Sequence, residues 1–477
     1  MVFSSHLFLF YFLLLALGLY YAAHKFGGNT LKHLVLTGIS YLFYGWANPL
    51  FVLLMAWSTM IDYICGLVIA GGQPAELPRG EPRSRAQKIA LTVSILSNLS
   101  LLAFFKYFNF GIDTFTALGL TGVQDSVMRI TLPLGISFYT FQSMSYSIDV
   151  FRGDAKAIRN PIDFACYVSM FPQLVAGPII RFSEVAQQLV HRTHTIEKFS
   201  RGVAFFAMGM AKKILLANPC GWIADQAFNA GSVGFVDAWF GVTAYSMQIY
   251  YDFSGYTDMA IGLGLMLGFV FPKNFDSPYI SQSITEFWRR WHISLSSWLR
   301  DYLYIPLGGN RKGTVRTYIN LALVMLLGGL WHGASWNFVV WGAIHGAMLA
   351  FERFQGKDSF YRALPRVGKI VITYVIVLFT WVFFRADTTG DAFTYVLSML
   401  GMGDTSAGSA LIGAAMYKPY YLLHFAIAVG IAFFGTQTWN FTRKITPAKA
   451  VFIFVLFLYA VLVMTTQSFN PFIYFKF

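Results

Sequence analysis

The sequence predicts an all-α protein that crosses a membrane many times. Of its 477 residues, 56% are hydrophobic and 12% are charged, and the mean hydropathy is +0.55. Apolar stretches recur along the whole chain, but several are shorter than the roughly 20 residues that a full span needs. We therefore expect about ten or eleven transmembrane helices plus re-entrant or kinked elements. The stretches are residues 7–23, 34–46, 51–70, 89–110, 130–148, 204–217, 238–253, 259–271, 318–331, 338–351, 371–384, 420–434 and 451–464.

The first stretch is expected to remain in the mature chain. Residues 1–6 carry no Lys or Arg, and no small-residue cleavage pattern follows Tyr21, so a signal peptide is not indicated. Topology is predicted from the basic residues, because short cytoplasmic loops are enriched in Lys and Arg. Basic residues cluster in the connector 71–88 and again at 443–449, before the last stretch. Both termini are therefore expected on the outer face of the membrane.

The segment 130–182 is apolar but interrupted by Pro and Gly. Pro removes a backbone donor, and non-helical backbone at membrane depth is tolerated only inside protein or beside a cavity. These pieces are expected to line an internal chamber. No internal repeat suggests two related halves of a transporter, so we expect one membrane domain over residues 1–477, with an outer tail at 465–477. The three cysteines have no metal-site spacing and are interpreted as buried thiols.

An arginine-rich patch between apolar stretches offers two interpretations. Arginine forks bind phosphate and stack on aromatic rings, so the patch can hold a pantetheine-bearing or nucleotide-like donor. The alternative is ordinary cytoplasmic anchoring, which charge alone favours. The interleaving of arginine with tryptophan supports the donor site. Its candidate residues are Trp288, Arg289, Arg290, Trp291, Trp298 and Arg300.

Two histidines stand out because ionisable groups at membrane depth usually line a cavity, an ion path or a reaction site. His332 ends an apolar run, and His292 lies within the arginine-rich patch. For His332, a neutral histidine bonded between helices is the competing interpretation. His345 is thirteen residues further on, which places it on roughly the opposite face of a continuous helix. Asp252 and Asp258 are interpreted as a Gly-broken turn between spans rather than a catalytic pair.

Several motifs together resemble the membrane-bound O-acyltransferase family. The similarity is strongest to the bacterial branch with the alginate O-acetyltransferase membrane subunit, and weaker to the D-alanyl transferase of teichoic acid modification. It extends along the chain but thins after about Arg385. The motifs are Glu286-Phe-Trp-Arg-Arg-Trp-His292-Ile-Ser-Leu-Ser296, Arg300-Asp-Tyr-Leu-Tyr304, Leu307-Gly-Gly-Asn-Arg311 and Gly328-Gly-Leu-Trp-His332-Gly.

The resemblance implies a funnel through a bacterial inner membrane, where a cytoplasmic acyl thioester meets an acceptor from the periplasm. The family's invariant histidine corresponds to His332, and its upstream histidine, near the thioester channel, to His292. A neutral imidazole, with an unperturbed pKa of about 6.5, can act as general base. Trp331 or Asn337 are candidate oxyanion donors. The donor, acetyl-CoA or an acyl carrier protein, is a substrate, and we expect no bound cofactor, no metal and no nucleic acid.

The C-terminal residues 470–477 are almost wholly apolar although they are predicted to lie outside. An interfacial aromatic anchor is one explanation. The ending also resembles an aromatic motif of bacterial O-acylation systems, which implies that Tyr474 accepts the acyl group and passes it to a periplasmic SGNH-type acetyltransferase. Two function classes stay open at this point. The first is an acetyltransferase for an exported polysaccharide, and the second is a polysaccharide or lipid-linked sugar exporter without group transfer.

Overall fold

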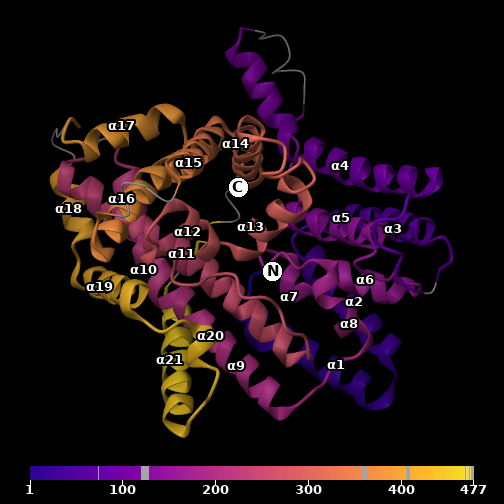
Figure 1. The fold of residues 1–477 in the computed structure, drawn as a ribbon. Coiled ribbons are helices and arrows are strands. Elements are labelled where there is room, and N and C mark those ends of the chain that lie inside the picture. The colour runs from indigo at the N-terminus through magenta and orange to yellow at the C-terminus, as the bar shows by residue number, and fades with distance from the viewer. Residues whose placement is uncertain are drawn as a thin grey trace. The chain divides into compact units, whose positions relative to one another are not determined.

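The computed structural model confirms the predicted fold class. It describes the whole chain except residues 74, 120–127, 232, 357–362, 404–408, 468, 472 and 474–477, and every regular element in the described part is a helix (Figure 1). Seven of these helices are long and apolar enough to cross a membrane, which makes this a multi-pass membrane protein. The expected number of ten or eleven crossings stays a prediction.

The chain forms two compact units, and two of the three boundaries between them fall within long helices. The first unit comprises Met1–Val203 with Ala260–Pro272, and the second Ala204–Met259 with Lys273–Phe477. The organisation as a single acyltransferase domain stays a prediction.

The first unit holds the segment predicted to be broken by Pro and Gly. There α5 begins after Gly135, whose φ of 77° is in the left-handed region that favours glycine, and the short helices α6 and α7 follow. Most of this segment is buried, and its expected role in lining an internal chamber stays a prediction. The helices of the unit are η1 (Phe8–Phe12), α1 (Leu13–Phe26), α2 (Asn29–Gly45), α3 (Phe51–Ala70), α4 (Arg85–Ala117), α5 (Ile136–Arg152), α6 (Pro161–Ser169), α7 (Phe171–Leu174), α8 (Phe182–Val190) and α9 (Ile196–Ala211), which continues into the second unit.

The second unit contains both candidate histidines and most of the remaining helices. Its arginine-rich patch forms two short helices, α12 and α13, and His332 is the last residue of α14. The helices are η3 (Lys212–Ala217), α10 (Asn218–Phe228), α11 (Phe235–Met266), η4 (Pro278–Ile280), α12 (Ile284–Arg290), α13 (Ile293–Leu299), η5 (Arg300–Tyr304), α14 (Thr314–His332), α15 (Trp336–Gln355), α16 (Arg366–Arg385), α17 (Thr389–Met399), α18 (Ser409–Met416), α19 (Pro419–Phe434), α20 (Thr438–Phe441) and α21 (Pro447–Thr466).

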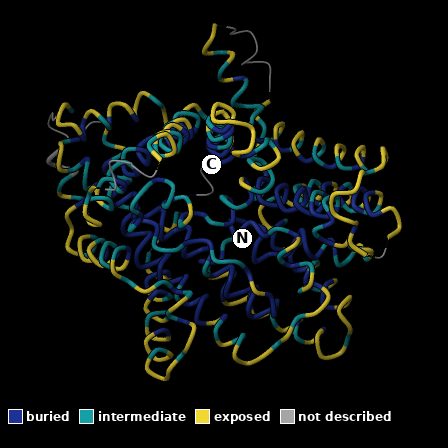
Figure 2. Tube along the Cα trace, in the orientation of Figure 1, coloured by how far each residue is buried: buried dark blue, intermediate teal, exposed yellow. Residues whose placement is uncertain are grey.

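Burial along the chain agrees with a membrane protein whose outer helices face lipid. Figure 2 shows α4 and α21 largely exposed, and their exposed side chains include large apolar residues such as Leu96, Phe104, Phe452 and Phe454. Such a large exposed apolar surface is unusual for a soluble monomer, but it is favourable in contact with the acyl chains of a bilayer.

The predicted turn at Asp252 and Asp258 is wrong. The helix α11 continues through both residues, and each carboxylate pairs with a lysine of η3: Asp252 with Lys213 at 2.8 Å and Asp258 with Lys212 at 2.6 Å. The local preference of Asp and Gly for a turn is therefore overridden by tertiary ion pairs, and the segment stays helical.

Candidate active site

The position of His332 follows from how closely α14 and α15 pack. His332 ends α14, and the chain turns at Gly333 before α15 begins at Trp336. A Cβ atom on Gly342 would lie 2.5 Å from the Met325 carbonyl oxygen, so the two backbones meet where only glycine fits. This contact fixes the end of α14 against α15.

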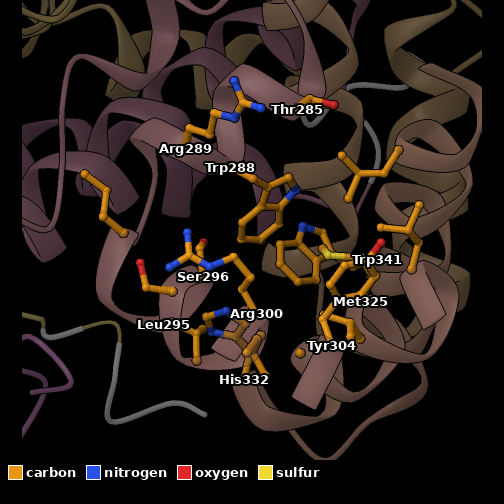
Figure 3. Close-up of a pocket in the computed structure, with 17 residues that line it drawn as sticks. Thr285, Trp288, Arg289, Leu295, Ser296, Arg300, Tyr304, Met325, His332 and Trp341 are labelled. Atoms are coloured by element: carbon orange, nitrogen blue, oxygen red, sulfur yellow. The ribbon is translucent and has the colours of Figure 1, made fainter. Parts of the chain in front are cut away.

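A cavity of about 470 Å³ opens beside His332. Figure 3 shows Thr285 and Arg289 toward one end of the cavity, His332 at the other, and Trp288 between them. The remaining walls are mainly apolar, which suits a long and mostly uncharged ligand with a charged end. The lining residues are Thr285, Trp288, Arg289, Ile293, Leu295, Ser296, Ser297, Leu299, Arg300, Tyr304, Leu321, Val324, Met325, Gly328, His332, Trp341 and Leu349.

Aromatic rings surround the imidazole of His332. The ring centroids of Trp331, Phe384 and Trp341 lie 5.1, 5.2 and 5.3 Å from that of His332, all in edge-on contacts. The residue is only 5% exposed, and it lines the cavity. Its ring is thus held by packing and faces a space that a substrate can enter.

His292 lies behind His332, with 6.2 Å between the ring centroids. It is fully buried, adopts a left-handed φ of 45° at the start of α13, and is absent from the cavity lining. Its Nδ1 lies 3.3 Å from the Asn274 side-chain oxygen, and because an amide oxygen can only accept, Nδ1 is the donor in this contact. Asn274 also accepts hydrogen bonds from the backbone and hydroxyl of Ser294. His292 therefore lies in the protein layer behind the cavity and does not face the cavity itself.

The structure separates the arginines of the predicted donor site. Arg289 and Arg300 line the cavity, and Arg300 is paired with Asp301 at 2.7 Å on its exposed side. Arg290 instead pairs with Glu286 at 2.8 Å and donates to the Asp276 carbonyl, so its charge is used inside the protein.

The tryptophans of the predicted donor site divide in the same way. Trp288 lines the cavity and packs edge-on against Trp341. Trp291 stacks on Phe287, and Trp298 packs against Tyr302. Both are buried and absent from the cavity lining, so they build its surroundings.

Neither predicted oxyanion donor lines the cavity. The Asn337 amide donates to the Ala386 carbonyl at 2.6 Å, and its oxygen accepts from the Thr389 hydroxyl. These bonds use both polar atoms of the Asn337 side chain and connect the start of α15 to the residues around the start of α17. Sequence reasoning missed Tyr304 and Ser296, whose hydroxyl-bearing side chains do line the cavity.

His345 does not share a helix with His332, so the rotation argued from a continuous helix does not apply. It is on α15, where its Nδ1 accepts from the Trp288 indole at 3.3 Å and its Nε2 lies 3.1 Å from the Thr380 hydroxyl. It is absent from the cavity lining and braces Trp288 from behind. Among the described residues, no cluster of His, Cys, Asp or Glu is arranged to hold a metal ion.

The fold and the site together define a multi-pass membrane protein with a buried histidine facing a cavity. The chain belongs to the membrane-bound O-acyltransferase family, whose model matches residues 6–385, and it is therefore an O-acyltransferase. This confirms the resemblance carried by the motifs.

Individual relatives support the same assignment. The chain is similar to the probable alginate O-acetylase AlgI of Azotobacter vinelandii, at 44% identity over the full length of both chains. It is 35% identical to the peptidoglycan O-acetyltransferase of Helicobacter pylori, over 85% of this chain and 81% of that one. A more distant similarity, 31% identity over 50% of this chain and 59% of the relative, is to the teichoic acid D-alanyltransferase of Streptococcus thermophilus.

Proposed function

We propose that this protein moves an acetyl group from a cytoplasmic thioester across the bacterial inner membrane, for O-acetylation of an exported polysaccharide. The observation that carries the proposal is the cavity that joins Arg289 and Trp288 to His332. The names of the similar proteins, an alginate O-acetylase and a peptidoglycan O-acetyltransferase, support an acetyl donor and a glycan acceptor. An exporter without group transfer is disfavoured by membership of an acyltransferase family.

The donor is proposed to enter with its charged end at the arginines. Arg289 and Arg300 are exposed, so both can bind phosphate groups from the cytoplasm. The apolar walls and Trp288 accommodate the pantetheine arm of acetyl-CoA or of an acyl carrier protein. The thioester carbonyl then lies near His332.

The chemistry assigned to His332 is general acid–base catalysis. The imidazole takes the proton of an attacking hydroxyl while the new C–O bond forms at the thioester carbonyl. The C–S bond then breaks, and the same proton passes to the leaving thiolate. Such assistance is typically worth about 10² to 10⁴ in rate. His292 is proposed to support the His332 ring from behind.

The first acceptor is proposed to be Tyr474, which lies outside the described residues. The phenol loses its proton to His332, forms an aryl ester and passes the acetyl group to a periplasmic SGNH-type acetyltransferase, with both termini on the periplasmic side. A phenol has an unperturbed pKa of about 10, so it needs a base at neutral pH. Its ester remains reactive enough to transfer the acyl group again.

The histidine assignment is tested by His332→Ala, with His424→Ala as the matched control. His424 is also a buried histidine of an apolar helix, but it bonds the carbonyl of Tyr420 in its own helix and lies outside the cavity lining. We expect His332→Ala to abolish acetylation of the exported polymer at wild-type membrane levels, and His424→Ala to retain it. Normal acetyl content in His332→Ala would refute the proposal.

The relay is tested separately by Tyr474→Phe, which keeps the ring and removes the hydroxyl. We expect it to lose polymer acetylation as fully as His332→Ala. Mass spectrometry of the wild-type protein, incubated with donor but without its outer partner, should show an acetyl adduct on the C-terminal peptide. Full activity of Tyr474→Phe would instead favour direct transfer to an external acceptor.

A further inference from the structure

We propose that a buried lysine–aspartate pair in the second unit is the binding site for the C-terminal segment of the chain. The pair joins Lys213 of η3 to Asp252 of α11 at 2.8 Å, and both side chains are only 2% exposed. The ligand is a peptide segment, recognised mainly through backbone groups of Phe469, Pro471 and Ile473. This site is independent of the proposed acyl transfer, except in its consequence for Tyr474.

An ion pair at this depth is costly unless every polar group has a partner. The ammonium group of Lys213 forms the ion pair with Asp252, and it donates hydrogen bonds to the Asn218 side-chain oxygen 2.8 Å away and to the Pro471 carbonyl. The second carboxylate oxygen of Asp252 accepts the backbone N–H of Ile473 at 2.8 Å. The segment thus completes both halves of the pair.

Asn218 binds the two residues that precede Pro471, namely Phe469 and Asn470. Its amide donates to the Phe469 carbonyl at 3.3 Å and to the Asn470 side-chain oxygen at 3.2 Å. The Phe469 ring packs edge-on against Trp222 at 5.5 Å, also in the second unit. Three polar side chains and one aromatic ring therefore hold the segment at Phe469, Asn470, Pro471 and Ile473.

These contacts distinguish a bound peptide from a lipid anchor. Ile473 is only 6% exposed, and its amide is bonded to a charged group of the protein. An aromatic anchor at the bilayer surface would face lipid and would need no such partner. The prediction that the tail is solely an interfacial anchor does not account for these bonds.

The site forms because the end of α9, directly before η3, approaches α11 closely. A Cβ on Gly209 would lie 2.5 Å from the Gly255 carbonyl, and a Cβ on Gly255 would lie 2.7 Å from the Gly209 carbonyl. This glycine contact brings two neighbouring lysines of η3 to the carboxylates of α11. The segment η3 is a π-helical turn, a feature that often occurs at functional sites.

The neighbouring pair supplies an internal comparison. Lys212 and Asp258 join the same two helices at 2.6 Å and are also largely buried. Among the described residues, neither makes a hydrogen bond to the C-terminal segment. If the segment is held by the specific geometry of Lys213, then only the loss of Lys213 should release it.

The consequence for function rests on the proposed role of Tyr474. This tyrosine directly follows Ile473, so the ion pair determines where the preceding backbone is held. Lys213 and Asp252 act as positioning residues and do not touch the reacting atoms. A released segment would present its tyrosine less often to the acyl donor.

The test is hydrogen–deuterium exchange of the full-length protein in lipid nanodiscs, comparing wild type with Lys213→Met and Lys212→Met. We expect the C-terminal peptide to exchange at least about tenfold faster in Lys213→Met, since fraying of an unanchored segment costs little free energy. Lys212→Met should match wild type in this peptide. Peptides from α14 should be unchanged in both variants, which shows that the unit is folded.

Equal protection of the segment in Lys213→Met and wild type would overturn the proposal, as would equal release in both lysine variants. If Lys213→Met does not fold, Asn218→Ala supplies the same test, because it removes the bonds to Phe469 and Asn470 and leaves the ion pair in place. Its tail must then exchange faster than wild type.

Polymer acetylation separates this site from the proposed relay. If both the binding site and the acyl relay through Tyr474 are correct, polymer acetylation is lost in Lys213→Met as it is in Tyr474→Phe. If Tyr474→Phe is fully active while Lys213→Met still releases the segment, the binding site stands and the acyl relay fails.

Discussion

The close packing of α14 and α15 predicts that a single methyl group will impair catalysis without contacting substrate. In Gly342→Ala, the new Cβ would lie 2.5 Å from the Met325 carbonyl oxygen and 3.2 Å from the Leu326 Cα. Relaxed contacts are roughly 3.5–4.0 Å, so the helices must separate locally by about 1 Å. Overpacking of this kind costs about 1–3 kcal/mol of stability.

The same movement reaches the base, because Met325 and His332 are both on α14 and line one cavity with Trp341 of α15. A misplacement of about 1 Å can cost on the order of 100-fold in rate, or about 2.7 kcal/mol in activation free energy. We therefore expect acetyl transfer to fall about 10- to 100-fold in Gly342→Ala, with donor affinity less affected. The assay is transfer from labelled donor, normalised to folded protein in the membrane.

Gly346→Ala is the matched control, one turn further along α15. Its Cβ would lie 3.4 Å from the Ala322 Cα and the Met325 Cβ, which is ordinary contact. Alanine is favoured over glycine in a helix by about 1 kcal/mol, so this variant should be active and no less stable. If both variants had the same activity, the reasoning that α14–α15 spacing positions His332 would be refuted.

Three further predictions concern the surroundings of the cavity. Arg289→Ala should raise the donor KM with little change in melting temperature, whereas Arg290→Ala should lower melting temperature because it breaks the internal pair; equal KM effects would contradict this assignment. Asn337→Ala should destabilise the protein by about 1–3 kcal/mol in thermal unfolding, because the Ala386 carbonyl and the Thr389 hydroxyl lose their partner. A lower transfer rate with unchanged stability would instead support Asn337 as an oxyanion donor. The Glu352 carboxylate accepts hydrogen bonds from the backbone of Ile284 and Thr285 at the start of α12. Glu352→Ala should therefore increase amide exchange in α12, and unchanged exchange would exclude this role.

The sequence was informative where local pattern and tertiary packing agree. The apolar stretch 51–70 corresponds to α3, and the Trp-His-Gly motif marks the end of α14 at His332. In these places the hydrophobic run and the terminating glycine suffice, because no distant residue is needed to set the boundary.

The sequence failed where distant charges decide. Asp252 and Asp258 resemble turn residues locally, but their carboxylates are satisfied by two lysines some forty residues earlier in the chain. In the same way, nothing in the spacing tells Arg289 from Arg290. The difference arises because Glu286 and the Asp276 carbonyl bind one of them and leave the other at the cavity. Single-sequence periodicity contains no information about such partners.

The surroundings of the two histidines explain why only one is assigned as the base. A general base must reach the proton that it removes, directly or through one water. His332 lines the cavity and can do so, whereas His292 is fully buried, with Nδ1 beside Asn274 and its ring edge-on to Phe253 at 4.6 Å. Loss of His292 should therefore act through the orientation of the His332 ring. It should lower the rate of transfer while leaving the cavity able to bind donor, the opposite of the effect expected for Arg289.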